Sequence, residues 1–163
     1  MQRFRATTVV AMLVATSVLG WWLGAQRRTA SQSVRVLRAI DGDTIVVVFP
    51  DGHTDTVRIL GVDTPETHHP KKPVQCFGAE AAAYTARRLT GRSVRLEADV
   101  EDRDIYGRRL AYVYLEGRRF DDELLERGYA RLLVIAPNTA HARTMLAEEL
   151  DAQRNHRGLW AEC

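Results

Sequence analysis

Three strand-like segments follow one another closely where the apolar N-terminal region of this chain gives way to mixed sequence. They are "VRVLRAI" (34–40), "TIVVVF" (44–49) and "TDTVRIL" (54–60), all rich in β-branched residues. The second and third are joined by "PDGH", a turn sequence typical of a β-hairpin. The sequence therefore predicts a meander of three antiparallel strands at the start of the domain.

A loop and a mixture of helices and strands follow this meander. The loop "GVDTPETHHPKKPVQC" (61–76) contains three prolines, too many for a helix or a central strand. The alanine-rich stretch from Phe77 to Gly91 is expected to form a helix. Two further strands are expected after it, in "SVRLEAD" and "RLAYVYL". Five strands with a helix between the third and fourth is the order of an OB-fold.

Two more helices are expected near the C-terminus. One is a short helix at about 121–127, and the last runs from Asn138, a good N-cap residue, to about Asn155. The apolar positions of the last helix recur at helical spacing and predict a buried face made of Ala142, Met145, Leu146 and Leu150. We therefore predict an α+β domain, a five-stranded OB-fold barrel with three helices, over residues 34–163.

The N-terminal region reads as an export segment. Arg3 and Arg5 precede an uncharged apolar run that ends near Ala25. The run is about 20 residues long, enough to span a bilayer and longer than the roughly 7–15 apolar residues of a cleavable signal. Trp21 and Trp22 suit a membrane interface. Residues 1–25 are thus expected to be a signal peptide or a membrane anchor, and a buried helix of the domain is the less favoured alternative because no amphipathic pattern marks one.

This segment implies an exported protein, extracellular or anchored facing outside the cytoplasm. The polar stretch "QRRTASQS" (26–33) then reads as a linker to the domain. Arg3 and Arg5 account for the formal net charge of +2, so the rest of the chain is balanced. The net charge of this part of the chain therefore gives no indication of a polyanionic partner. Any nucleic-acid site must be inferred from the local arrangement of residues. We expect a monomer.

Two cysteines, Cys76 and Cys163, suit an exported chain in which one disulfide forms. Closing so long a loop is worth roughly 4–5 kcal/mol in the chain-entropy model. Two unpaired thiols are the alternative. A metal site built on so few cysteines is not expected.

Several charged residues converge at one end of the predicted hairpin. Asp43 stands at the start of the second strand, although Asp is depleted in strands, while Asp63 and Thr64 follow the third strand. A tight turn joins these strands, so the start of one lies beside the end of the other. Two converging carboxylates repel each other unless a positive charge lies between them. Carboxylates, a backbone carbonyl and waters are ligands that suit Ca²⁺.

Two arginines and a glutamate complete the candidate site. Arg58 lies in the third strand between Val57 and Ile59, so it points away from the face those two share. Arg108 follows a Tyr-Gly turn. A cation and two guanidinium groups could bind phosphate oxygens as charge builds, and Glu66 could act as general base. Taken singly, each residue has a structural alternative, such as a surface ion pair or a solvated turn, but their combination favours phosphoryl chemistry.

The chain also resembles a known family. "AIDGDT", "VDTPET", "HPKK", "YGR", "LAYVY" and "GLW" occur in this order over about residues 34–162 and are similar to motifs of the staphylococcal-type thermonucleases. Those are extracellular, Ca²⁺-dependent nucleases with an OB-fold. The resemblance implies hydrolysis of DNA and RNA with little sequence specificity and with release of 3′-phosphate products.

The resemblance also implies roles for individual residues. By matching motifs, Asp43 and Asp63 would bind Ca²⁺ through their carboxylates and Thr64 through its main-chain carbonyl. Arg58 and Arg108 would bind phosphate, and Glu66 would activate or orient the attacking water. Asp41 would support the turn rather than the metal. The positions near the substrate phosphates are filled by Lys71, Lys72 and Tyr106.

One departure from the family pattern concerns substrate contacts. Where the family places two tyrosines before "KPNNT", this chain reads "LLVIAPNT", one residue shorter and without tyrosine. Stacking on an aromatic ring contributes about 1–3 kcal/mol per base, so affinity and base preference are expected to differ. Two alternatives stay open: an OB-fold module that binds single-stranded nucleic acid without cutting it, and a Ca²⁺-stabilised surface interaction domain.

Overall fold

The structure is a computed structural model that describes residues 32–67 and 73–163. The expected anchor at 1–25, most of the expected linker at 26–33, and Lys71 and Lys72 lie outside the described residues. Among the residues that are described, no helix has the length and apolar character needed to cross a bilayer.

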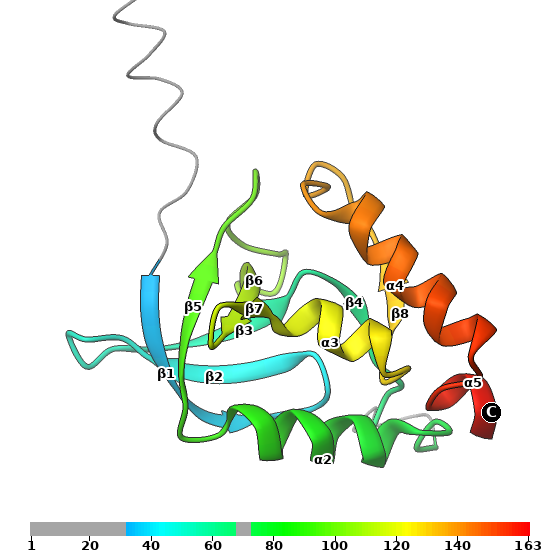
Figure 1. Cartoon of the computed structure of the whole chain (residues 1–163). Helices are drawn as coiled ribbons and strands as arrows, with labels where there is room; N and C mark the ends of the chain where they lie inside the picture. Colours follow the sequence, from blue (N-terminus) through cyan, green and yellow to red (C-terminus); the bar gives the residue numbers. More distant parts are fainter. Residues whose placement is uncertain (1–31, 68–72) are drawn as a thin grey trace, which may run out of the picture. The chain divides into compact units, whose positions relative to one another are not determined.

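Five strands close into a barrel (Figure 1). They are β1 (Gln32–Ala39), β2 (Thr44–Val48), β3 (Thr54–Ile59), β5 (Ser93–Glu97) and β6 (Arg109–Leu115). The pairs β1–β2, β2–β3, β1–β5 and β5–β6 are antiparallel, and the parallel pair β3–β6 closes the barrel. The predicted OB-fold is confirmed. β1 begins at Gln32, inside the stretch expected to be linker.

The barrel interior is filled by the β-branched residues that predicted the strands. Alternate side chains of β1, β2 and β3 point inward and are at most 3% exposed: Val34, Val36, Ile45, Val47, Val57 and Ile59. Full burial of one such side chain contributes roughly 1.5–3 kcal/mol. The alternation leaves the intervening residues, including Arg58, on the opposite side of the strands.

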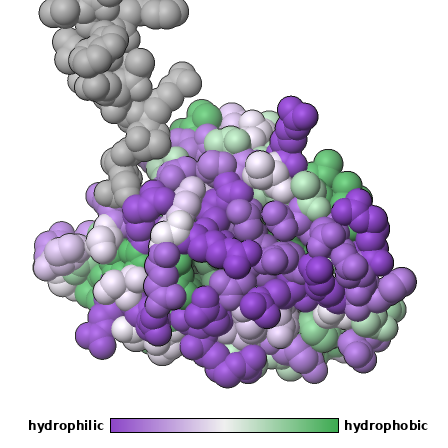
Figure 2. All heavy atoms as spheres, viewed as in Figure 1, coloured by the Kyte–Doolittle hydropathy of each residue, from purple (hydrophilic) through white to green (hydrophobic). Residues whose placement is uncertain are grey.

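The three predicted helices are present. They are α2 (Gly78–Leu89), α3 (Phe120–Glu126) and α4 (Ala142–Arg154). α2 packs against β1, and α3 packs against β6 and α4 (Figure 1). A single further turn, α5 (Leu159–Glu162), was not expected from the sequence. The face of the molecule shown in Figure 2 is mostly hydrophilic, with small hydrophobic patches.

Three short strands also depart from the sequence prediction. β4 (Gly61–Asp63) occupies the start of the stretch expected to be loop, and it pairs with β8 (Arg131–Leu133). β7 (Arg118–Arg119) pairs with the end of β6 in antiparallel orientation. The prediction of a loop from residue 61 was therefore wrong for its first three residues. The reason is that β4 depends on a partner about 70 residues away, which local composition does not reveal.

The last helix begins later than predicted. α4 starts at Ala142 with His141 at its N-cap, so Asn138 is not the cap. The side-chain oxygen of Asn138 instead accepts hydrogen bonds from the backbone N–H groups of Val100 and Glu101 at 2.9 and 2.8 Å. Of the expected apolar face, Met145 is fully buried.

The rest of that face is less buried than expected, because Leu146 and Leu150 are 43% and 41% exposed. α4 packs on α3 and β8 along a narrower stripe than the sequence pattern indicated.

The two cysteines are joined in the structure. Cys76, just before α2, and Cys163, at the end of the chain, form a disulfide with 6.0 Å between their Cα atoms. The bond connects the start of α2 to the C-terminus, two segments that Figure 1 places side by side.

Candidate active site

The turn between β1 and β2 presents Asp43 to the site. The backbone N–H of Asp43 donates to Oδ1 of Asp41 at 3.1 Å, and its carbonyl accepts from the N–H of Ile59 at 2.9 Å. Asp41 thus supports the turn, as the family resemblance implied. Because Thr44 pairs with Arg58 across the two strands, Asp43 lies directly beside the end of β3.

Asp63 and Thr64 arrive at the same place because β4 follows β3 after a single residue. The N–H and Oγ1 of Thr64 donate to Oδ2 of Asp43 at 2.9 and 3.1 Å. Both Asp43 and Thr64 are buried, at 6% and 8% exposed. The side chain of Asp63 is 57% exposed. The expected convergence of these three residues is present.

Arg58 lies between the two carboxylates. Its Nε is 3.3 Å from Oδ1 of Asp43 and its Nη2 is 3.3 Å from Oδ1 of Asp63. Nη1 donates to the backbone carbonyls of Ile59 and Val62 at 2.7 and 2.8 Å. A guanidinium held at this many points is fixed in orientation, as a group that binds phosphate oxygens must be.

A cavity of about 230 Å³ gathers these groups. It is lined by Asp41, Asp43, Arg58, Asp63, Thr64, Pro65, Glu66 and Arg108. Every catalytic and metal-binding residue expected from the sequence is in this set. The lining is almost wholly polar, so the cavity suits ions and phosphate rather than an apolar ligand.

Two carboxyl groups of the cavity, those of Asp41 and Asp63, have raised pKa values. Burial, and then the nearby charge of Asp43, raise the pKa of Asp41 to about 6. Burial and then Asp43 also raise the pKa of Asp63, while Arg58 works in the opposite direction. Repulsion by a neighbouring carboxylate is the condition that a bound cation relieves.

The donor set fits a hard divalent cation. Among the described residues, the carboxylate of Asp63 meets one donor group, Nη2 of Arg58 at 3.3 Å, so it has free lone pairs. Asp43 and the Thr64 carbonyl would add further oxygens, with waters completing the shell that Ca²⁺ requires. The described residues contain no group of three or more His, Cys, Asp or Glu side chains placed to hold a metal ion, so a cation here would depend on the Thr64 carbonyl and on waters as further ligands. The oxygen-only set does not suit zinc.

Arg108 is held at the cavity by a residue that the sequence motifs did not single out. Its Nε donates to Oδ2 of Asp104 at 2.6 Å, and its backbone N–H donates to Oδ1 of the same residue at 2.9 Å. The guanidinium carbon lies 5.5 Å from the centre of the Tyr106 ring. Asp104 therefore orients Arg108. The spacing of four residues between the two was the feature of the sequence that could have indicated this ion pair.

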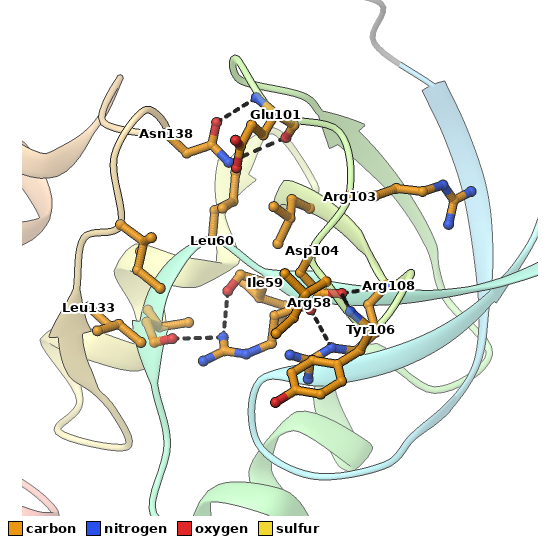
Figure 3. A pocket seen from close by; sticks show the side chains of 15 residues that line it. Arg58, Ile59, Leu60, Glu101, Arg103, Asp104, Tyr106, Arg108, Leu133 and Asn138 are labelled. Carbon is orange, nitrogen blue, oxygen red and sulfur yellow. Dashed lines mark hydrogen bonds and ion pairs between the residues drawn. The ribbon is translucent and has the colours of Figure 1, made fainter.

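A larger cleft of about 620 Å³ adjoins the cavity and shares Arg58 and Arg108 with it (Figure 3). Figure 3 shows Arg58 and Tyr106 at one end of this cleft and Asn138 with Glu101 at the other. Tyr106, expected near the substrate, is 78% exposed at the rim. The wall formed by Leu133 and Ile135 is aliphatic, in keeping with the missing tyrosines.

Two more residues hold the site and were not recognised from the sequence. Thr85 of α2 donates a hydrogen bond to the carbonyl of Gly42, and Gln75 is bonded to the backbone of Glu66. Both contacts join residues that are far apart in the chain or separated by a loop. No sequence motif marks either of them.

Known proteins resemble this chain closely. A family model described as "Staphylococcal nuclease homologue" matches residues 56–162. The chain is 42% identical over 130 residues to the thermonuclease of Staphylococcus hyicus, covering 80% of this chain and 76% of that protein. It is also 41% identical over 132 residues to endonuclease YncB of Bacillus subtilis, covering 80% of this chain and 62% of that protein.

Proposed function

The chain belongs to the staphylococcal nuclease homologue family, and from that premise we propose that it is a Ca²⁺-dependent phosphodiesterase. It hydrolyses DNA and RNA with little sequence specificity and leaves 3′-phosphate products. Relatives named as a thermonuclease and an endonuclease support a nuclease hydrolase with nucleic acid as its substrate. The dependence on calcium and the chemistry of the products are the parts that the proposal adds.

One observation carries this proposal. Three aspartates, two oriented arginines and Glu66 line a single polar cavity of about 230 Å³. A module that only binds nucleic acid has no need of converging carboxylates beside a candidate base, because electrostatic contacts to phosphates and stacking of bases are sufficient for binding.

The residues of the cavity would have distinct roles in hydrolysis. Asp43, Asp63 and the Thr64 carbonyl would hold Ca²⁺, which when bound supplies positive charge to a phosphate oxygen. Arg58 and Arg108 would donate N–H groups to the remaining oxygens, where charge increases in the transition state.

Glu66 would accept a proton from the attacking water or orient it. The expected cost of losing this role, as in Glu66→Gln, is a 10²–10⁴-fold lower turnover at unchanged folding.

The decisive experiment is a nuclease assay on purified residues 30–163. We expect single-stranded DNA and RNA to be degraded with Ca²⁺ and to stay intact when a chelator is added. Binding without cleavage would instead support the non-catalytic OB-fold module. Sensitivity of the cleaved ends to a 3′-phosphatase checks the product chemistry, and 5′-phosphate ends would refute that part.

Export is also proposed, on the strength of residues 1–25. Their uncharged run follows two arginines, and the Cys76–Cys163 disulfide suits an oxidising compartment. Fractionation of cells that produce the full chain should place it in the membrane fraction if the segment stays uncleaved. A secreted protein whose mass corresponds to a chain that starts near residue 26 would identify a cleaved signal peptide. We further propose a monomer, which size-exclusion chromatography checks.

A further inference from the structure

We infer that Gln75 is a positioning residue for Glu66, an inference that rests on the hydrolytic function proposed above. Two hydrogen bonds run in opposite directions between these residues. The N–H of Glu66 donates to Oε1 of Gln75 at 2.8 Å, and the N–H of Gln75 donates to the carbonyl of Glu66 at 2.9 Å. Together they hold the backbone of Glu66 on both sides.

Gln75 is itself well anchored. Its carbonyl accepts from the N–H of Gly78, the first residue of α2, at 3.0 Å. The next residue, Cys76, is bonded to Cys163. Gln75 therefore connects the backbone of Glu66 to a helix and, through the disulfide, to the C-terminus.

The start of α2 also lies against the backbone that carries Glu66. A Cβ atom at Gly78 would lie 3.0 Å from the carbonyl oxygen of Pro65 and 3.1 Å from that of Glu66. Such contacts are tighter than nearly all those made by real Cβ atoms, so a side chain at this position would press on the backbone of Pro65 and Glu66. The contact and the two hydrogen bonds link the backbone of Glu66 to the start of α2, whereas Asp43 lies in the β1–β2 turn and Arg58 lies in β3.

Glu66 lies beyond the end of β4, outside the strands and helices, so its hydrogen bonds with Gln75 bear on where its backbone lies. Thr64, two residues before Glu66, is held by the hydrogen bond from its N–H group to Asp43. A displacement of about 1 Å at a reacting group can cost on the order of 10²-fold in rate. A residue that fixes the backbone of the general base thus affects turnover although it does not touch the substrate.

The arrangement makes a prediction that a purely structural role does not. The side chain of Gln75 is exposed, so Gln75→Ala leaves no buried group unpaired and should change the melting temperature little. We expect kcat to fall about tenfold or more, with KM unchanged. Ca²⁺ affinity, measured by calorimetry, should also stay unchanged, because Asp43 and Asp63 keep their supports.

Two further variants sharpen the test. Gln75→Glu keeps an acceptor oxygen for the N–H of Glu66 and should recover kcat to within about threefold of the unsubstituted protein. Gln32→Ala, at an exposed glutamine of β1 remote from the cavity lining, is the matched control and should have no effect.

The closing experiment is a double-mutant cycle with Glu66→Gln. If Gln75 acts through Glu66, adding Gln75→Ala to Glu66→Gln should lower kcat no further. An equal loss in both backgrounds, or an unchanged kcat in Gln75→Ala alone, overturns the inference while the proposed function stands. If Glu66→Gln leaves turnover unchanged, the role proposed for Glu66 fails, and the inference fails with it.

Discussion

The hydroxyl of Thr85 donates a hydrogen bond of 2.7 Å to the backbone carbonyl of Gly42. Thr85 is fully buried in α2, and Gly42 lies between the two aspartates of the β1–β2 turn. On its other side Gly42 faces Thr64 so closely that a Cβ atom would lie 2.6 Å from the methyl group of that residue. The turn that presents Asp43 is therefore held between α2 and Thr64.

This contact predicts that Thr85→Val weakens the Ca²⁺ binding proposed above. Valine keeps the shape of threonine but leaves the Gly42 carbonyl without its donor, at a cost of about 1–3 kcal/mol in the free energy of unfolding. The turn should loosen, and the calorimetric affinity for Ca²⁺ should fall several-fold. Thr85→Ser, which retains the hydroxyl, is the control. An unchanged affinity in a less stable Thr85→Val protein would limit Thr85 to a structural role.

Replacement of Arg108 by lysine should lower turnover by about 10²–10³-fold. Lysine keeps the charge but loses the planar fork that binds phosphate oxygens, and it cannot reproduce the orientation given by Asp104. The readout is steady-state cleavage of single-stranded DNA. Arg35→Lys, on an exposed position of β1, serves as control. Equal rates for both variants would remove Arg108 from the chemistry.

An aromatic residue in the adjoining cleft should strengthen substrate binding. Leu133 lines this cleft and is 37% exposed (Figure 3). Base stacking on an introduced ring contributes about 1–3 kcal/mol, so Leu133→Tyr should lower the Kd for a short oligonucleotide by roughly tenfold. Fluorescence anisotropy with a chelator present measures binding without cleavage, and Leu133→Met is the aliphatic control. No gain with tyrosine would show that bases do not reach this wall.

The burial of Asp121 predicts that the free energy of unfolding falls as the pH rises. Asp121 is fully buried, its Oδ1 accepts from the N–H of Val113 at 3.0 Å, and its Oδ2 has no hydrogen-bond partner among the described residues. Burial raises the pKa of Asp121 to about 8. Because the folded state holds the proton more tightly than the unfolded state, the stabilisation is complete below about pH 4 and is lost as the pH rises toward 8.

Asp121→Asn removes this titration while keeping the acceptor for Val113. The free energy of unfolding of the unsubstituted protein should fall between pH 5 and pH 8 by up to about 1.4 kcal/mol per pH unit more than that of the variant. Urea unfolding at a series of pH values measures the difference. Parallel pH profiles for the two proteins would show that Asp121 is ionised in the folded state.

The disulfide should contribute substantially to stability. Cys76→Ser combined with Cys163→Ser should lower the free energy of unfolding by about 2–5 kcal/mol. Denaturant unfolding measures the loss, and Ser93→Ala, at an exposed residue of β5, is a control for the loss of a small surface side chain. Alkylation of the unfolded protein before and after reduction should differ by two modified cysteines. Equal masses would mean that no bridge forms.

The sequence was sufficient to predict those parts of the site that lie on strands adjacent in the chain. Asp43, Arg58 and Asp63 belong to one hairpin and the short strand after it, so alternation and a tight turn were enough to bring them together. The prediction was wrong where one local signal competed with a distant partner. Asn138 looks like a helix cap, but its amide oxygen binds the backbone of Val100 and Glu101 instead.

By itself the sequence determined the barrel, the helices that cover it and the residue types of the cavity. These follow from periodicity and turn chemistry, which act over a few residues. The tertiary structure alone decided what holds the site in place: Thr85 behind the Gly42 turn, Gln75 beside Glu66, and β4 on β8. Each of these is a hydrogen bond to a backbone group, which any residue provides, so the partner cannot be identified until the chain has folded.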